Sequence, residues 1–148
     1  MGSKKDLFAK AVLQLIFQNT DILGIGDSGG LLGSITAGNL YIALFKNGLG
    51  PSDSAQGTEC DYTGYARKAI PRNSTGWGWW VGLMRNSAVV TFDTCTAGTD
   101  SAGHFAVCKA GVAGVDDAIY WGDLTSDLPI SAGVAPEFII GALVITEN

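Results

Sequence analysis

The sequence predicts a mainly β protein: a single β-sandwich of jelly-roll or Ig-like type, with about eight strands and one N-terminal amphipathic helix. Apolar runs of strand length recur through the last third of the chain, and each ends at Gly, Pro, Asp or Ser. The 148 residues include 21 glycines, which suits frequent tight turns. Hydrophobic residues make up 47% and charged residues 16%, a balance that argues against disorder. We therefore expect one domain over residues 1–148.

Residues 4–18 are predicted to form the helix. Ser3 is a suitable N-cap, and Asp6 three residues later gives a partial capping box. Apolar side chains recur at helical spacing and form one face. This face packs either on the protein's own sandwich or on a neighbouring subunit, and the sequence leaves both open. Its members are Leu7, Phe8, Ala11, Val12, Leu15 and Ile16.

Residues 24–38 are rich in glycine and serine and are predicted to form a loop, and residues 39–146 the sandwich. Residues 47–64 form a long polar loop, which in a compact domain is often functional or an interaction surface. The expected strands cover residues 39–46, 65–70, 77–81, 88–92, 104–109, 118–124, 128–133 and 136–146.

The net charge and the apolar pattern indicate which classes of partner are unfavourable. The net charge of −5 and the pI of about 4.6 are unfavourable for nucleic-acid binding, which needs a clustered basic face. No apolar stretch reaches the roughly 20 residues of a spanning helix, and no signal peptide is evident, so we expect synthesis in a cytoplasm without membrane association. Cys60, Cys95 and Cys108 fit neither a disulfide framework nor a metal site, so we expect buried reduced thiols.

Two short motifs suggest chemistry, but neither has the context that the chemistry needs. Residues 26–30, Gly-Asp-Ser-Gly-Gly, match the segment around a serine-protease nucleophile, yet the single histidine, His104, follows Ser28 in the chain. Residues 24–29 match G-x-G-x-x-G but follow a helix instead of a strand. Asp116 and Asp117 fit a hairpin turn better than a calcium site. We predict no catalytic residue, no cofactor and no metal.

Three tryptophans form the most unusual cluster. Strand alternation places Trp77 and Trp79 on one face and Trp80 on the other. The rings suit ordinary core packing, a subunit interface, or a platform for a carbohydrate ligand. All three interpretations remain open.

The order of several segments resembles a family of small tailed-bacteriophage virion proteins, often labelled tail fibre protein, with similar domains serving as head decoration or cement proteins. The resemblance covers residues 7–146. Its most specific parts are the Gly-Tyr-Ala-Arg step at 64–67 and the closing Ser-Ala-Gly…Pro-x-Phe stretch between 131 and 138. Further matching segments are 40–45, 57–59, 104–107, 121–124 and 143–146.

The resemblance implies a non-enzymatic structural protein of the virion. The leading hypothesis is a capsid decoration protein that stabilises the head, a homo-oligomer with a trimer as the expected state, in contact with the major capsid protein. The alternative is a tail or tail-fibre component in contact with other tail proteins, which binds the host surface through the tryptophan strand or the 47–64 loop. Two further hypotheses from other classes are a carbohydrate-binding module based on Trp77, Trp79 and Trp80, and an enzyme based on Ser28.

Overall fold

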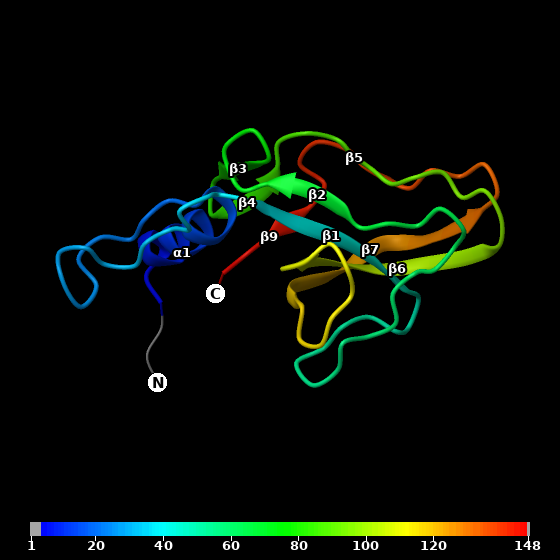
Figure 1. Ribbon diagram of the computed structural model, residues 1–148, viewed down its shortest axis with the longest axis horizontal. Coiled ribbons are helices and arrows are strands. Elements are labelled where there is room, and N and C mark those ends of the chain that lie inside the picture. The colour runs from blue at the N-terminus through cyan, green and yellow to red at the C-terminus, as the bar shows by residue number, and fades with distance from the viewer. Residues whose placement is uncertain (1–3, 148) are drawn as a thin grey trace. The chain divides into compact units, whose positions relative to one another are not determined.

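The computed structural model describes residues 4–147, which fold mainly into β-strands after one N-terminal helix (Figure 1). The described residues form two compact units. The first contains residues 4–39, 71–89 and 138–147, and the second contains residues 40–70 and 90–137. The mainly β prediction is confirmed, whereas a closed sandwich is not shown among the described residues. The prediction of a single domain stays a prediction.

The first unit combines the helix with a small sheet. Helix α1 covers Asp6–Gln18, and the sheet has the order β3-β4-β9, with antiparallel neighbours. The strands are β3 (Trp77–Trp80), β4 (Leu83–Asn86) and β9 (Val144–Ile145). The helix begins at Asp6 with Lys5 as its N-cap, so the capping role expected of Ser3 falls outside the described residues.

The side chains that the helix buries completely are not members of the predicted apolar face. Leu13 and Phe17 are fully buried, and the ring of Phe17 meets Trp77 edge-on at 4.6 Å between centroids. Leu7 is 81% exposed, Phe8 is also exposed, and Val12 is half-buried. The predicted apolar face is therefore only partly covered. Leu13 and Phe17 are buried because they are four residues apart, lie on the same side of the helix and face the sheet.

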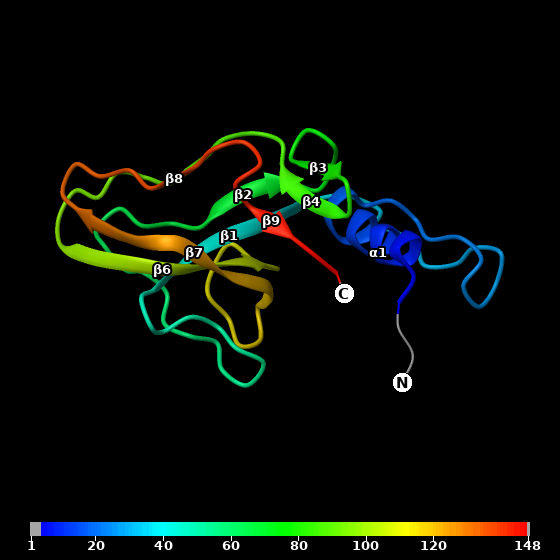
Figure 2. The same ribbon diagram turned by 180° about the vertical axis from the view of Figure 1, so that it is seen from behind.

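The segment after α1 is a loop (light blue in Figure 2), and hydrogen bonds hold it to the end of the helix. Asn19 ends the helix in the left-handed conformation, and its amide exchanges hydrogen bonds of 2.7 and 2.8 Å with the backbone of Ser34. Arg72 donates to the helix carbonyls of Leu15 and Ile16 at 2.8 and 2.6 Å. A cation at this position satisfies carbonyls that the helix leaves unpaired.

The second unit is built on a four-stranded sheet with the order β2-β1-β6-β7. Strand β1 covers Asn39–Lys46, as predicted, and pairs antiparallel with β6. The pairing of β6 with β7 is also antiparallel, and Figures 1 and 2 show these two long strands side by side. The remaining bounds are β2 (Lys68–Pro71), β6 (Thr99–Cys108) and β7 (Ala118–Ser131), with a separate ladder of β5 (Val90–Thr91) and β8 (Glu137–Phe138).

Several strand boundaries differ from the prediction. The strand expected at 65–70 begins only at Lys68, and the strand expected at 136–146 is two short pieces, β8 and β9. The two strands expected at 118–124 and 128–133 are one strand, β7, whose register with β6 shifts between Asp123 and Leu128. Strand β4 was not predicted. Its residues 83–86 lack the run of β-branched side chains that marks a strand in sequence.

The first unit depends on the buried ring of Trp77. We expect Trp77→Ala to lower the free energy of unfolding by about 3–5 kcal/mol, because the substitution leaves a cavity against Phe17. Trp80→Ala, at a ring that is 65% exposed, is the matched control, with an expected change within about 0.5 kcal/mol. Urea unfolding followed by circular dichroism measures both. Equal losses in the two variants would contradict the assignment of Trp77 to the core.

Candidate functional site

A buried arginine joins the 47–64 loop to the segment before β7 in the second unit. The Nε and Nη2 atoms of Arg67 donate to the two carboxylate oxygens of Glu59 at 2.9 and 3.0 Å. Its Nη1 donates to the Asp117 carboxylate and to the backbone carbonyls of Ala110 and Val112. Burial opposes the charge of Arg67, but the hydrogen bonds to Glu59 and Asp117 raise its pKa above the ordinary value. The guanidinium therefore stays charged and holds both carboxylates.

Tyr65 completes this cluster, which we call the Arg67 network (Glu59, Tyr65, Arg67 and Asp117). The Tyr65 hydroxyl donates to Glu59 at 2.6 Å and accepts from the Leu44 N–H at 3.0 Å. Its ring stacks on Phe92 and meets Tyr62 edge-on, with centroids 6.0 and 5.4 Å away. Burial and the hydrogen bond to Glu59 raise the pKa of Tyr65, so the hydroxyl remains a donor. The network consequently anchors the loop to β1.

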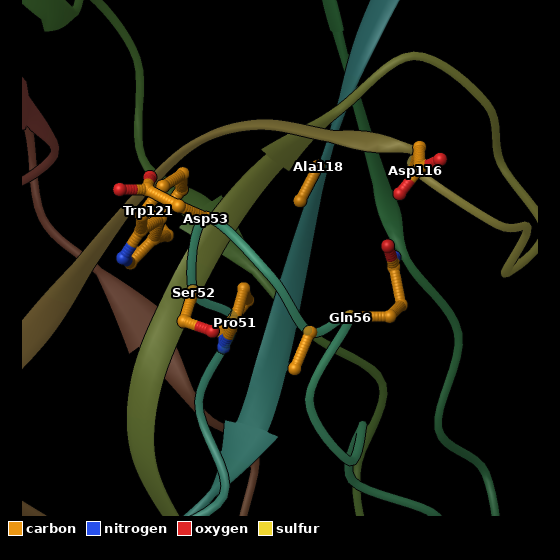
Figure 3. A pocket seen from close by; sticks show the side chains of 8 residues that line it. Pro51, Ser52, Asp53, Gln56, Asp116, Ala118 and Trp121 are labelled. Atoms are coloured by element: carbon orange, nitrogen blue, oxygen red, sulfur yellow. The ribbon is translucent and has the colours of Figure 1, made fainter.

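A surface pocket lies next to this network, and we call it the Trp121 pocket (Figure 3). Its volume is about 240 Å³, and it is formed by the tip of the 47–64 loop and the beginning of β7. In the view of Figure 3, Trp121 and Asp53 lie at one side, and Gln56 and Asp116 at the other. The lining residues are Pro51, Ser52, Asp53, Ala55, Gln56, Asp116, Ala118 and Trp121.

A β-bulge directs two residues of β7 into the Trp121 pocket. Successive residues of β6 pair with Tyr120 and Ala118, so that Ile119 is an extra residue in β7. Without it, Ala118 and Trp121 would point to opposite faces of the strand. With it, both line the pocket, and the Trp121 ring is 42% exposed. Sequence reasoning missed Trp121, because no residue pattern announces a bulge.

The predicted tryptophan cluster lies in the first unit and does not act as one platform. Trp77 is core, whereas Trp79 is half-buried and Trp80 exposed. These two rings line a pocket of about 410 Å³, the Trp79 pocket, together with Arg85, whose Nε is buried without a hydrogen-bond partner among the described residues. Lys10 lies 5.5 Å above the Trp79 ring. The other lining residues are Gly78, Asn86, Ser87, Ile140 and Gly141.

Ser28, His104 and Asp117, which the sequence analysis considered as candidates for chemistry, each contact neighbouring residues of the protein. Ser28 lies on an exposed turn in which the Asp27 carboxylate accepts hydrogen bonds from the Gly29 and Gly30 N–H groups at 2.8 and 3.0 Å. The His104 Nδ1 lies 2.7 Å from an Asp123 carboxylate oxygen. Asp116 and Asp117 lie in the connection between β6 and β7, as the predicted hairpin turn requires, and the Asp117 side chain is buried against Arg67.

The three cysteines are buried free thiols, as the sequence predicts. Cys60, Cys95 and Cys108 are unpaired and buried, and burial raises the pKa of Cys60 and of Cys108 to about 12 each. Over residues 4–147, no group of three His, Cys, Asp or Glu side chains is placed to hold a metal ion. The same residues contain no helix with the length and hydrophobicity to cross a membrane.

The protein is a mainly β chain with surface pockets and a buried Arg67 network. Its family is shown by a match of residues 33–146 to the model described as podophage GP4 fiber I protein gp80. The chain belongs to this family, and it is accordingly a phage virion structural protein labelled as a fiber. The predicted resemblance to tailed-phage proteins labelled tail fibre is confirmed. None of the curated proteins compared with the chain matches it.

The Arg67 network predicts a large stability loss on substitution. We expect Arg67→Met to lower the free energy of unfolding by about 3–5 kcal/mol, because two carboxylates lose their buried cation. Lys68→Met, one residue further on, removes only a partly exposed ion pair with Asp93 and should cost at most about 1 kcal/mol. Urea midpoints with unchanged m-values measure the difference. A loss for Arg67→Met no greater than for Lys68→Met would contradict the network's role.

The buried thiols predict a fall in stability at alkaline pH. Cys60 and Cys108 have folded-state pKa values of about 12 against an ordinary value of 9.0, so the folded state favours the neutral thiol. This contribution is complete below pH 9.0 and is lost as the pH rises toward 12. Urea unfolding measured at successive pH values should show the fall, and the Cys60→Ala/Cys108→Ala variant should show a smaller one. Equal slopes would contradict the assignment.

Proposed function

We propose that the protein is a non-enzymatic component of the phage tail fibre that contacts carbohydrate on the host surface. The family match over residues 33–146 carries this proposal. A partly exposed indole ring beside hydrogen-bonding groups supports the carbohydrate part, since such rings have an apolar face for a sugar and a polar edge.

The proposed assembly is a homo-oligomer, with a trimer as the expected state, joined to other tail proteins. Uncovered apolar side chains of the first unit support it, because a monomer gains nothing by exposing them to water. Leu7, Phe8 and Val12 of the helix are the proposed contacts. Trp79 and Trp80 are proposed as either a second interface or a ligand platform. Further exposed apolar residues in this unit are Leu23, Leu32, Ile35, Ile139 and Ile140.

A capsid decoration role is the second proposal. The same exposed helix residues would suit contacts with shell subunits, which is the observation in its favour. The fiber description of the family supports the tail position better. In either role the protein is a part of the virion.

Gold-labelled antibodies against the purified protein separate the two positions on intact particles. We expect label at the tail fibres in electron micrographs, because the family description is that of a fiber. Label spread over the head would favour the decoration role, and unlabelled particles with positive protein blots of infected cells would contradict both.

Host attachment is tested by competition. Host cells pre-incubated with the purified protein should adsorb fewer particles, because the protein occupies the same surface carbohydrate. The Leu7→Ser/Phe8→Ser variant should compete less strongly if the helix assembles a multivalent oligomer. Its mass in analytical ultracentrifugation shows whether assembly has been lost. Undiminished adsorption at saturating protein would contradict the host-contact proposal.

A further inference from the structure

The Trp121 pocket presents unsatisfied hydrogen-bonding groups of both kinds. The Oε1 of Gln56 accepts from the backbone N–H of Asp117 at 3.4 Å, which fixes the orientation of the amide. The Nε2 is then left as a donor, buried and without a hydrogen-bond partner among the described residues. Asp53 and Asp116 are exposed, and neither has an ion-pair partner among residues 4–147. The pocket thus offers one buried donor without a protein partner and two solvent-exposed carboxylates that can accept hydrogen bonds.

This combination selects among ligand classes. An anion is disfavoured, since the lining contains two carboxylates and no basic residue. An ammonium group would satisfy Asp53, Asp116 and the indole face, but it has no oxygen for the Gln56 amide. A sugar ring supplies hydroxyl hydrogens, hydroxyl oxygens and an apolar face together. We propose that the Trp121 pocket binds one uncharged, hydroxyl-bearing sugar ring of a bacterial surface polysaccharide, a site that rests on the proposed host-contact function.

The size of the pocket agrees with a single ring. Pockets for drug-sized ligands have volumes of about 300–1,000 Å³. The Trp121 pocket, at about 240 Å³, lies just below this range. A longer glycan would place one residue in the pocket and leave its neighbours in solvent.

The loop side of the pocket is held in place before any ligand arrives. Ser52 and Ala55 exchange backbone hydrogen bonds of 2.8 and 3.3 Å, which closes the turn that carries Asp53. Gly57 has a φ of 79°, and a Cβ there would lie 2.7 Å from the backbone of residues 49–51. The loop therefore needs glycine at this position.

The Arg67 network supports the other side. The Asp117 carboxylate accepts one hydrogen bond from Arg67 Nη1 and another, of 3.0 Å, from the Ala110 N–H. These two hydrogen bonds fix its position. Its own N–H orients Gln56. The network thus positions the donor that recognises the sugar, although it does not touch the ligand itself.

Nuclear magnetic resonance of the ¹⁵N-labelled full chain tests the site directly. The four tryptophan indole N–H signals are assigned by single substitutions. Glucose, galactose, mannose, rhamnose and N-acetylglucosamine are then titrated separately, with glucuronic acid and tetramethylammonium as charged counterparts. We expect at least one uncharged sugar to shift the Trp121 indole and the Gln56 side-chain amide, and to leave the Trp80 indole unchanged.

Matched variants define the contributions. Trp121→Ala should weaken binding of that sugar by about tenfold or more, and Gln56→Leu by about fivefold, because each removes one contact. Thr125→Ala, at an exposed position of β7 outside the pocket, should bind as the unmodified protein does. The one-dimensional methyl spectrum of each variant checks that it is folded, and Trp121→Phe replaces Trp121→Ala if the latter is not.

Each other result has a defined meaning. No Trp121-dependent shift with any uncharged sugar, a shift with tetramethylammonium alone, or tighter binding of glucuronic acid than of glucose would overturn the sugar site. None of these results depends on where the protein lies in the particle. Sugar binding by a protein that antibodies locate on the head would instead overturn the fibre proposal and leave this site standing.

Discussion

The charge of Arg67 is the constraint on which the second unit depends. A guanidinium that is almost completely buried must have carboxylates and carbonyls around it, because an unpaired buried charge is strongly destabilising. Glu59 comes from the long polar loop, Tyr65 from the segment before β2, and Asp117 from the residue before β7. Their convergence fixes a loop that has almost no regular secondary structure. A polar segment of this length is otherwise expected to be mobile.

The same arrangement links stability to the proposed sugar site. Asp117 is shared: its side chain neutralises Arg67, and its backbone N–H orients Gln56 in the Trp121 pocket. A fibre protein must expose binding groups to solvent and still keep them in one geometry, and a buried ion pair directly behind the surface meets both needs. The first unit also contains an arginine that donates to backbone carbonyls: Arg72 binds the end of α1, and Trp77 lies in the core. Its apolar helix side chains are left uncovered, as in a protein that has further contacts in an assembly.

Local patterns in the sequence predict the local structure well. Helical periodicity indicates α1, and the apolar run at 39–46 indicates β1. The turn residues indicate most of the later strands. Long-range pairing is not visible in this way: Arg67 and Asp117 are 50 residues apart, and Asp117 alone looks like a turn residue. The strand alternation around Trp77, Trp79 and Trp80 does not reveal which ring is core, because burial depends on Phe17 of the helix. The sequence does not single out Trp121, because the pocket that it lines forms only when the 47–64 loop folds against the beginning of β7.

An averaged electron cryo-microscopy map of the intact particle, with this chain fitted into density, tests most directly whether a rigid fibre component presents a sugar pocket. The expected result is density in the tail fibre, with the rim of the Trp121 pocket open to solvent and residues 7–12 against a neighbouring copy. Density confined to the capsid shell would contradict the fibre assignment. Fibre density in which a neighbouring chain fills the Trp121 pocket would contradict its role in host recognition.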